Sequence, residues 1–516
     1  MAEQDQNTPP NGDIISEKET EVSSTPPKPM SRAREISAII ILCLTQLLTQ
    51  AGLGQVLVPL HIIGREFGTE DPAQLSWYAA AYSLTVGTFI LIAGRWGDVY
   101  GHRLLVVVGY TWFGVWSVIA GCSAYSDQIM FDVCRALQGI GPAIVLPNSI
   151  AIISNMYPPG FKKNLVFSLY GATAPNGFLL GACFSSLLAK FAWWPWAFWI
   201  MGICCVLAAI ATQFVVPIQD SDRRTDRNIP GQLDPWGSIT GVVGLILVNF
   251  AWNQGPAVGW STPYTYFLLI IGLLILVLFF VIELRTSHPL VPIRSLSKET
   301  LYVLACIAGG WSCFGIFIYY ICRFLIVLRG HSILSTVAQL APCGISGLFA
   351  AFSNSILLPR LGPEYVMFIA LLAFLVGSIL VATAPVGQTY WIQTFLSVII
   401  MPWGMDLSYP AGVIIMSSAT PREHQGVAAS LMNTVVNYSI SIGLGIAGTA
   451  ESRVNSGGLD ILKGYHAAYY VGIGLAAVGW LVSLNFVLSS YREKMKMKMK
   501  VQEKESGVED DKEVES

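Results

Sequence analysis

The sequence predicts an all-α protein that spans a membrane fourteen times. Two related six-helix bundles are expected, with a pair of helices inserted between them. Three observations support this prediction: a scarcity of charge, long apolar runs and an internal repeat. Of the 516 residues, 53% are hydrophobic and only 12% are charged, whereas ordinary soluble chains carry roughly 25% charged residues. Residues 36–490 hold only 36 of the 62 charges, which argues against a large soluble enzyme.

The apolar runs are long enough to cross a bilayer, which takes about 20 mostly apolar residues in a helix. Short loops join them, and they are continuous rather than alternating, which excludes a membrane β-barrel. The fourteen predicted spans are 36–63, 74–93, 104–124, 127–153, 163–189, 193–217, 235–253, 264–284, 299–322, 333–358, 364–384, 389–416, 425–449 and 464–490.

Several function classes find no support in the composition. The net charge of −2 provides no basic field for nucleic acid. All ten cysteines lie in apolar runs without metal-ligand spacing, so we expect neither a metal site nor disulfides. No Gly-x-x-x-x-Gly-Lys loop is present, so ATP is not expected to drive the protein. No polar segment between the spans is long enough for a catalytic domain. We therefore expect no cofactor, no catalytic residues and no enzymatic activity.

The distribution of Lys and Arg predicts the orientation of the chain. An even number of spans places both tails on one side, and that side collects 20 basic residues against 6 on the other. Cytoplasmic loops are enriched in Lys and Arg, so both termini are predicted to be cytoplasmic, in a protein of the plasma membrane. Residues 1–35 and 491–516 are predicted to be disordered tails. Four tryptophans between 193 and 199 form either an aromatic belt or a packed helix interface.

The chain also matches itself at a fixed offset. A shift of 263 residues places Pro147 on Pro410 and Ser154 on Ser417, and a shift of 261 places Gly101 on Gly362. The first six helices therefore pair with the last six, unless these matches arise by chance. Parallel repeats with a path for substrate between them are typical of secondary transporters. The predicted domains are an N-tail (1–35), a first bundle (36–217), a linker with the inserted helices (218–298), a second bundle (299–490) and a C-tail (491–516).

A glycine-rich loop after the second predicted helix is a candidate cytoplasmic latch. It contains Gly94, Gly97 and Gly101, which permit a tight turn and close helix approach. Asp98 can pair with Arg103 or with the positive end of a helix. The loop could hold one conformational state in this way, or it could be an ordinary turn.

This loop resembles the signature loop of the major facilitator superfamily, Gly-x-x-x-Asp-x-x-Gly-x-Arg, and it has the expected place in the chain. Residues 135–141 are similar to the Arg-x-x-Gln-Gly motif of that superfamily. In the fifth predicted helix, Gly171, Pro175, Gly177 and Gly181 resemble the antiporter motif of exporters, with Ala174 as a departure.

The resemblance covers roughly residues 36–490 and extends to the fourteen-helix drug:proton antiporter group. Residues 49–55 and 59–64 look like the fungal aminotriazole- and boron-resistance branch. The resemblance implies the major facilitator fold and a monomeric exporter in the lipid bilayer, with a small molecule and protons as its partners.

Three buried charges are candidates for proton coupling. Arg135 should face the protein interior, because a charge at mid-bilayer is costly, and Asp132 lies three residues earlier on the same helix face. The two could form a proton-sensitive pair or a static one. Asp406 lies between Pro402 and Pro410, where a bend is expected, and either lines the substrate path or lies at its cytoplasmic mouth. Arg323 is expected to extend toward the outer membrane surface.

Amides within the spans could bind a polar substrate or join helices. Many members of the antiporter group carry an acid where this chain has Gln50, so the resemblance leaves the proton role of that position in doubt. The candidate cavity residues are Gln50, Gln55, Asn148, Asn176, Trp403, Asn433 and Asn437.

The sequence favours proton-coupled efflux of a small toxic compound or secondary metabolite. The alternative is a low-affinity uniporter or permease for a small polar solute such as boric acid or ammonium, which Gln50 favours. A nutrient receptor on a transporter scaffold would need a longer signalling tail than residues 491–516 provide.

Overall fold

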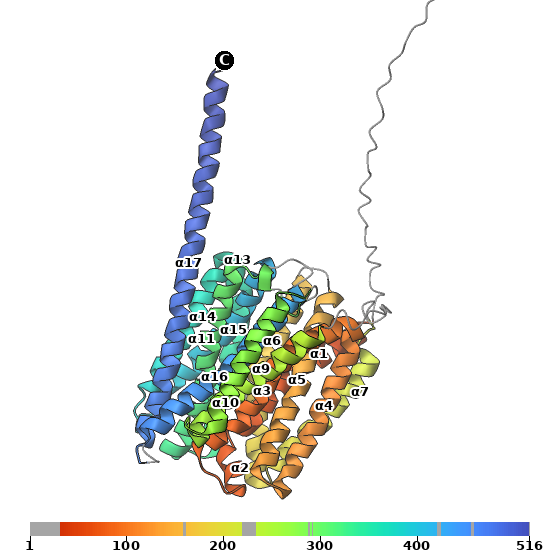
Figure 1. The fold of residues 1–516 in the computed structure, drawn as a ribbon, viewed down its shortest axis with the longest axis vertical. Coiled ribbons are helices and arrows are strands. Elements are labelled where there is room, and N and C mark those ends of the chain that lie inside the picture. Colours follow the sequence, from red (N-terminus) through yellow and green to blue (C-terminus); the bar gives the residue numbers. More distant parts are fainter. Residues whose placement is uncertain are drawn as a thin grey trace, which may run out of the picture.

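The computed structural model describes residues 31–157, 161–218, 234–286, 289–291, 293–419, 425–455 and 459–514, and all regular structure in these ranges is helical (Figure 1). The predicted all-α fold is confirmed. The first set of helices is α1 (Arg32–Leu57), α2 (Leu60–Glu66), α3 (Pro72–Tyr100), α4 (His102–Cys122), α5 (Gln128–Met156), α6 (Phe161–Phe191) and α7 (Pro195–Val215).

A hairpin and a second set follow. The hairpin consists of α9 (Pro235–Val258) and α10 (Pro263–Glu283). The second set is α11 (Lys298–Arg323), a π-helical turn (Phe324–Leu328), α12 (Ile333–Leu340), α13 (Pro342–Leu361), α14 (Pro363–Ala382), α15 (Gln393–Ala419), α16 (Gln425–Val454) and α17 (Ile461–Val514).

Thirteen helices in the described ranges are long and apolar enough to cross a membrane. The predicted span that is missing from these thirteen, 425–449, corresponds to α16, which has 30 residues and is rich in Ser, Gly and Asn. α16 packs against α3, α9, α11 and α17. A helix enclosed by other helices meets little lipid, so it does not need an apolar surface. By contrast, α10 exposes large apolar side chains such as Leu273, Leu274 and Val277, as a lipid-facing helix should.

The two sets repeat the same packing. In the first set, α1 packs on α6, α3 on α5, and α4 on both α5 and α7. In the second set, the corresponding contacts are all present: α11 packs on α16, α13 on α15, and α14 on both α15 and α17. The two sets meet where α3 contacts α16 and where α6 contacts α13. The hairpin helix α9 lies against α3 and α16.

Proline interrupts two of the predicted spans. The first span, 36–63, divides at Val58 and Pro59 into α1 and α2, and the tenth divides at Ala341 before Pro342. Proline has no backbone N–H and clashes with the preceding turn, so it ends or bends a helix. α2 lies at one end of the bundle, here called the α2 end, opposite the tail end from which α17 projects (Figure 1).

The tails differ from the prediction in one respect. Residues 1–30 lie outside the described residues. At the other terminus, helix α17 continues to Val514, where a disordered tail was expected from residue 491. The segment is dense in Lys, Glu and Met, which are good helix formers, and opposite charges three or four residues apart add further stability.

Candidate functional site

Two glycines of the predicted latch loop are required by the backbone and by close packing. Gly101 has φ of 97°, a conformation that side chains disfavour, and it separates α3 from α4. A Cβ on Gly97 would overlap Oδ1 of Asn148 and Nδ1 of His102. The loop therefore closes directly onto α5, and only glycine leaves room for the side chains that fill it.

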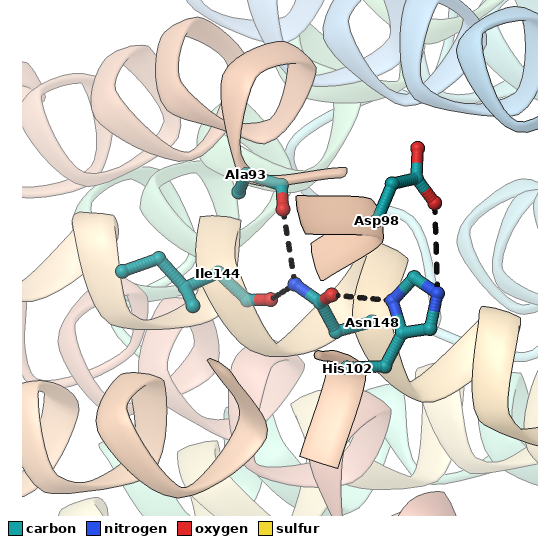
Figure 2. A network of polar contacts seen from close by, with 5 residues as sticks. All are labelled: Ala93, Asp98, His102, Ile144 and Asn148. Carbon is teal, nitrogen blue, oxygen red and sulfur yellow. Dashed lines mark hydrogen bonds and ion pairs between the residues drawn. The ribbon is translucent and has the colours of Figure 1, made fainter. Parts of the chain in front are cut away.

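These side chains form a buried polar network between α3, α4 and α5 (Figure 2). Nδ2 of Asn148 donates to the carbonyl oxygens of Ala93, at 3.1 Å, and Ile144, at 2.7 Å. Its Oδ1 lies 2.8 Å from Nδ1 of His102, and Nε2 of the same ring lies 3.6 Å from Oδ1 of Asp98. His102 is buried, whereas Asp98 is 56% exposed at the side chain.

Asn148 is fully buried, and its hydrogen bonds join the latch loop to α5. Its role as a cavity residue stays a prediction. Other latch residues reach further: Arg103 donates to the carbonyl oxygen of Gln213 at the end of α7. A Cβ on Gly94 would lie 2.6 Å from Oγ of Ser430 on α16. Gly94 thus allows the two sets of helices to approach closely at the tail end.

Arg135 is fully buried and joins three helices of the first set. Its Nε donates to the carbonyl oxygen of Tyr78 at 2.9 Å, and its Nη2 donates to that of Gly52 at 2.8 Å. Nη1 donates to Oε1 of Gln138, whose amide donates to Ser117 on α4 at 2.7 Å. The guanidinium also lies over the ring of Tyr82, 4.4 Å from its centroid.

The predicted pair of Arg135 and Asp132 is not formed in this structure. The ion pairs of the described residues do not include it. Oδ1 of Asp132 is buried and has no hydrogen-bond partner among those residues. The guanidinium is saturated by carbonyl groups, Gln138 and an aromatic ring instead, which spacing along one helix face could not show.

Two of the four residues of the antiporter-like motif bring α6 into contact with α1. A Cβ on Gly177 would overlap the carbonyl oxygen of Leu47, and one on Gly181 would overlap that of Ala51. By contrast, a Cβ on Gly171 would meet nothing within 4 Å. The motif therefore has a close-packed part and an open part.

Pro175, the fourth residue of the motif, lies at the contact between the two sets of helices. A Cβ on Gly347 of α13 would lie 2.8 Å from Cγ of Pro175 and 2.9 Å from Oδ2 of Asp406. Asp406 thus extends from α15 past the glycine toward α6. Its Oδ2 is buried without a hydrogen-bond partner among the described residues. A carboxylate oxygen therefore lies beside a proline of the other helix set.

A small apolar pocket of about 10 Å³ lies near this contact, between α6 of the first set and helices of the second. Its lining residues are Phe178, Leu179, Phe314, Phe317, Ile318, Leu340, Cys343, Val398 and Met401. Trp403 follows the lining residue Met401 by two positions, and its Nε1 donates to Oγ of Ser346 at 3.2 Å. The cavity provides apolar surface, and the polar groups lie on adjoining turns of α13 and α15.

The predicted amide residues fall in different places. Asn176 donates to the carbonyl oxygen of Ala172 at 2.8 Å and approaches Gly344 across the contact between the sets. Asn433 accepts from Tyr409 at 3.0 Å, and Asn437 donates to the carbonyl oxygen of Asn433 at 3.0 Å. Gln55 is buried, and its Nε2 has no partner in the described ranges. Gln50 is partly exposed.

The prediction for Arg323 was wrong. Arg323 is 4% exposed, and its Nη1 lies 3.4 Å from Oε1 of the equally buried Glu451 on α16. Glu451 carries no signal in the sequence, because it lies at the end of a span, where a charge costs little if it faces water. The tryptophan cluster forms a packed interface at least in part, since Trp194 is 2% exposed and Trp193 and Trp194 both donate to Glu66.

Two membrane-spanning sets of helices with the same packing, meeting around a buried carboxylate, define the architecture of a secondary transporter. The family model of the Major Facilitator Superfamily matches residues 42–444. The chain therefore belongs to the major facilitator superfamily.

Curated relatives and solved structures agree with this assignment. The chain is 56% identical to a low affinity ammonium transporter of Saccharomyces cerevisiae, with 93% of each chain covered. It is 45% identical to the efflux pump terJ of Aspergillus terreus, again with 93% of each covered. It is 39% identical to the aminotriazole resistance protein of Saccharomyces cerevisiae, covering 89% of this chain and 85% of that one. These names confirm the resemblance to the fungal drug-efflux branch.

The fold is shared with the solved structure of the POT family transporter PepTSo. The TM-score is 0.65 at 15% identity, and the match covers 90% of this chain and 99% of that one. The chain is thus a multi-pass integral membrane transporter for small molecules.

Proposed function

We propose that the protein exports a small organic compound in exchange for protons and that Asp406 is the proton-coupling group. The observation that carries this proposal is the position of Asp406. Its Oδ2 has no hydrogen-bond partner in the described part of the chain and lies where α13 and α15 approach Pro175 of α6. Such a contact must break when the two sets of helices, the two halves of the protein, move apart. Burying an unpaired ionised carboxylate is costly, so the contact closes readily only when a proton neutralises Asp406.

The expected substrate is a small, mainly apolar or weakly basic compound. The small pocket between the two sets of helices, where a substrate cavity would open, is apolar, and Trp403 and Ser346 provide polar atoms on adjoining turns. Ligand sites generally combine apolar walls with a few polar groups that fix orientation. Two of the relatives are named as an efflux pump and an aminotriazole resistance protein, which supports export and a transporter rather than an enzyme.

A second candidate function is low-affinity passage of ammonium or a similar small polar solute. The relative at 56% identity is named a low affinity ammonium transporter. Gln50 cannot titrate, so helix α1 provides no proton-binding acid at that position. In this alternative, flux follows the solute gradient and does not require a pH gradient.

Transport by the purified protein in proteoliposomes distinguishes the two functions. Radiolabelled 3-amino-1,2,4-triazole and methylammonium serve as probes, each with and without an imposed pH gradient. We expect triazole to accumulate against its gradient only when protons flow the opposite way, and Asp406→Asn to abolish this accumulation. Asp460→Asn, which changes an exposed acid paired with Lys463, is the matched control and should transport normally.

Three other outcomes are informative. Gradient-independent methylammonium flux without triazole transport would support the passage function and overturn the exporter. Flux of triazole that ignores the pH gradient would remove proton coupling. If Asp132→Asn loses the gradient response while Asp406→Asn keeps it, the coupling group is Asp132.

The tail end is proposed to face the cytoplasm, in a monomer at the plasma membrane. The orientation is supported by the excess of Lys and Arg on that side of the spans. Epitope tags at both termini of the protein in intact cells should resist added protease and become sensitive after permeabilisation. A tag cleaved at one terminus only would contradict the even number of spans.

A further inference from the structure

Helix α17 continues past the bundle at the tail end (Figure 1), and one side chain of α14 fixes how it is turned there. Oε1 of Glu364, in the first turn of α14, accepts a hydrogen bond from Oγ of Ser490 at 3.0 Å and lies 3.6 Å from Nζ of Lys494. Ser490 and Lys494 are four residues apart and so lie on one face of the helix. This face of α17 is therefore directed toward the bundle.

The face of α17 that is turned away from Glu364 carries a continuous apolar stripe. Its members are three, four or seven residues apart, so they share one side of the helix, and each is between 43% and 56% exposed. They are Leu481, Leu488, Tyr491, Met495 and Met499. The first two lie within the predicted span, where an exposed apolar side chain meets lipid. The stripe therefore continues the lipid-facing surface to the end of the candidate span at Lys496 and beyond it.

Two basic side chains stand at the edge of this stripe. Arg492 and Lys496 are exposed and lie four residues apart, so they extend from the same side of α17. The ion pairs of the described residues include neither of them. Residues 492–500 together carry five basic side chains and one acid, Glu493. The outward face thus combines apolar surface at the depth of the bilayer with positive charge at its border.

We propose that this face, formed by Tyr491, Arg492, Met495 and Lys496 and here called the lipid face, binds an anionic phospholipid. The guanidinium of Arg492 can form two parallel hydrogen bonds to a phosphate, and Lys496 adds a second charge one turn away. Tyrosine favours the border between lipid and water, and Met495 packs against the upper part of an acyl chain. Clusters of Lys and Arg directly beyond a membrane helix recognise anionic lipids in general.

The charge pattern further along α17 fits a lipid as the occupant. Residues 503–513 carry six acidic and two basic side chains, so an anionic membrane surface attracts residues 492–500 and repels the segment that follows. The helix should therefore leave the membrane at the basic segment, as α17 does in Figure 1. Because α17 packs against α11, α14 and α16, the bound lipid contacts the second half alone. The site does not depend on the proposed substrate or direction of transport.

Native mass spectrometry of the full chain in an uncharged detergent tests the lipid face without a transport assay. Dioleoyl phosphatidylserine and dioleoyl phosphatidylcholine are titrated separately, and the fraction of protein that retains each lipid gives its affinity. We expect phosphatidylserine to bind more tightly than phosphatidylcholine. Arg492→Gln and Lys496→Gln should each weaken phosphatidylserine binding roughly five-fold, which corresponds to about 1 kcal/mol for each basic residue at a membrane surface. The affinity for phosphatidylcholine should stay unchanged.

Lys494→Gln is the matched control, because it removes the same charge from the same segment but from the face that contacts Glu364. It should change the affinity for phosphatidylserine by less than about two-fold. The unfolding midpoints of all three variants, measured without added lipid, should equal that of the wild type, since the substituted side chains are exposed. Equal losses in all three variants would mean that positive charge attracts the lipid without a defined face, and this result would overturn the proposal. Equal affinity of the wild type for the two lipids would overturn it as well.

Discussion

Oδ1 of Asn148 accepts the hydrogen bond that Nδ1 of His102 donates, at 2.8 Å, and this contact turns Nε2 of the ring toward Asp98 (Figure 2). The amide orientation is fixed because Nδ2 of Asn148 donates to two carbonyl oxygens. The tautomer of neutral His102 follows from that orientation. One asparagine of α5 therefore sets the geometry of the latch loop between α3 and α4.

Asn148→Leu should destabilise the protein by about 1–3 kcal/mol, because it leaves the buried Nδ1 of His102 without its partner. The thermal unfolding midpoint in detergent measures this loss. Asn176→Leu is the control, since its side-chain amide donates only to its own helix, and it should cost less. Equal midpoints for the two variants would mean that the network contributes little.

Asp98→Asn should slow transport without preventing membrane insertion. The carboxylate faces Nε2 of His102 and is more than half exposed, so the change removes a charge from the latch while the buried packing remains. Surface expression and initial transport rates, measured in the same cells, separate the two effects. A normal rate at normal expression would show that the loop acts only as a turn.

Glycines of the antiporter-like motif should differ sharply in their tolerance of alanine. Gly177→Ala and Gly181→Ala would force Cβ atoms against backbone oxygens of α1, so we expect low yields of folded protein. At Gly171 the space around a new Cβ is open, and a helical Gly→Ala change there should be within about 1 kcal/mol of neutral or stabilising. Size-exclusion profiles of the three variants provide the comparison, and aggregation of Gly171→Ala would contradict it.

Arg135→Ala should destabilise the protein by about 3 kcal/mol or more, because several charge-assisted hydrogen bonds between α1, α3 and α5 are lost together. Arg135→Lys retains the charge but not the planar fork, so partial stability and partial transport are expected. Unfolding midpoints and transport rates test whether Arg135→Lys retains more stability and activity than Arg135→Ala. A stable, inactive Arg135→Ala protein would instead assign Arg135 to coupling.

The sequence alone determined the membrane class, the approximate spans, the repeat and the family. These features depend on composition, on apolar runs and on short motifs, all of which are local. A run of twenty apolar residues is favourable inside the bilayer. There it must form a helix, because every backbone polar group has to be satisfied within the segment. The breaks at Pro59 and Pro342 also follow from local chemistry, because proline cannot continue the helical hydrogen bonds.

Only the tertiary structure decided which polar groups meet. Asp132 and Arg135 share a helix face, yet Arg135 binds carbonyl groups of α1 and α3. Asn148 lies on α5 and hydrogen-bonds His102 of α4, a pairing that spacing along the chain does not show. Arg323 and Glu451 lie 128 residues apart in the chain and form a buried pair. A buried polar side chain must find a partner somewhere, and helix packing between distant segments determines which one it finds.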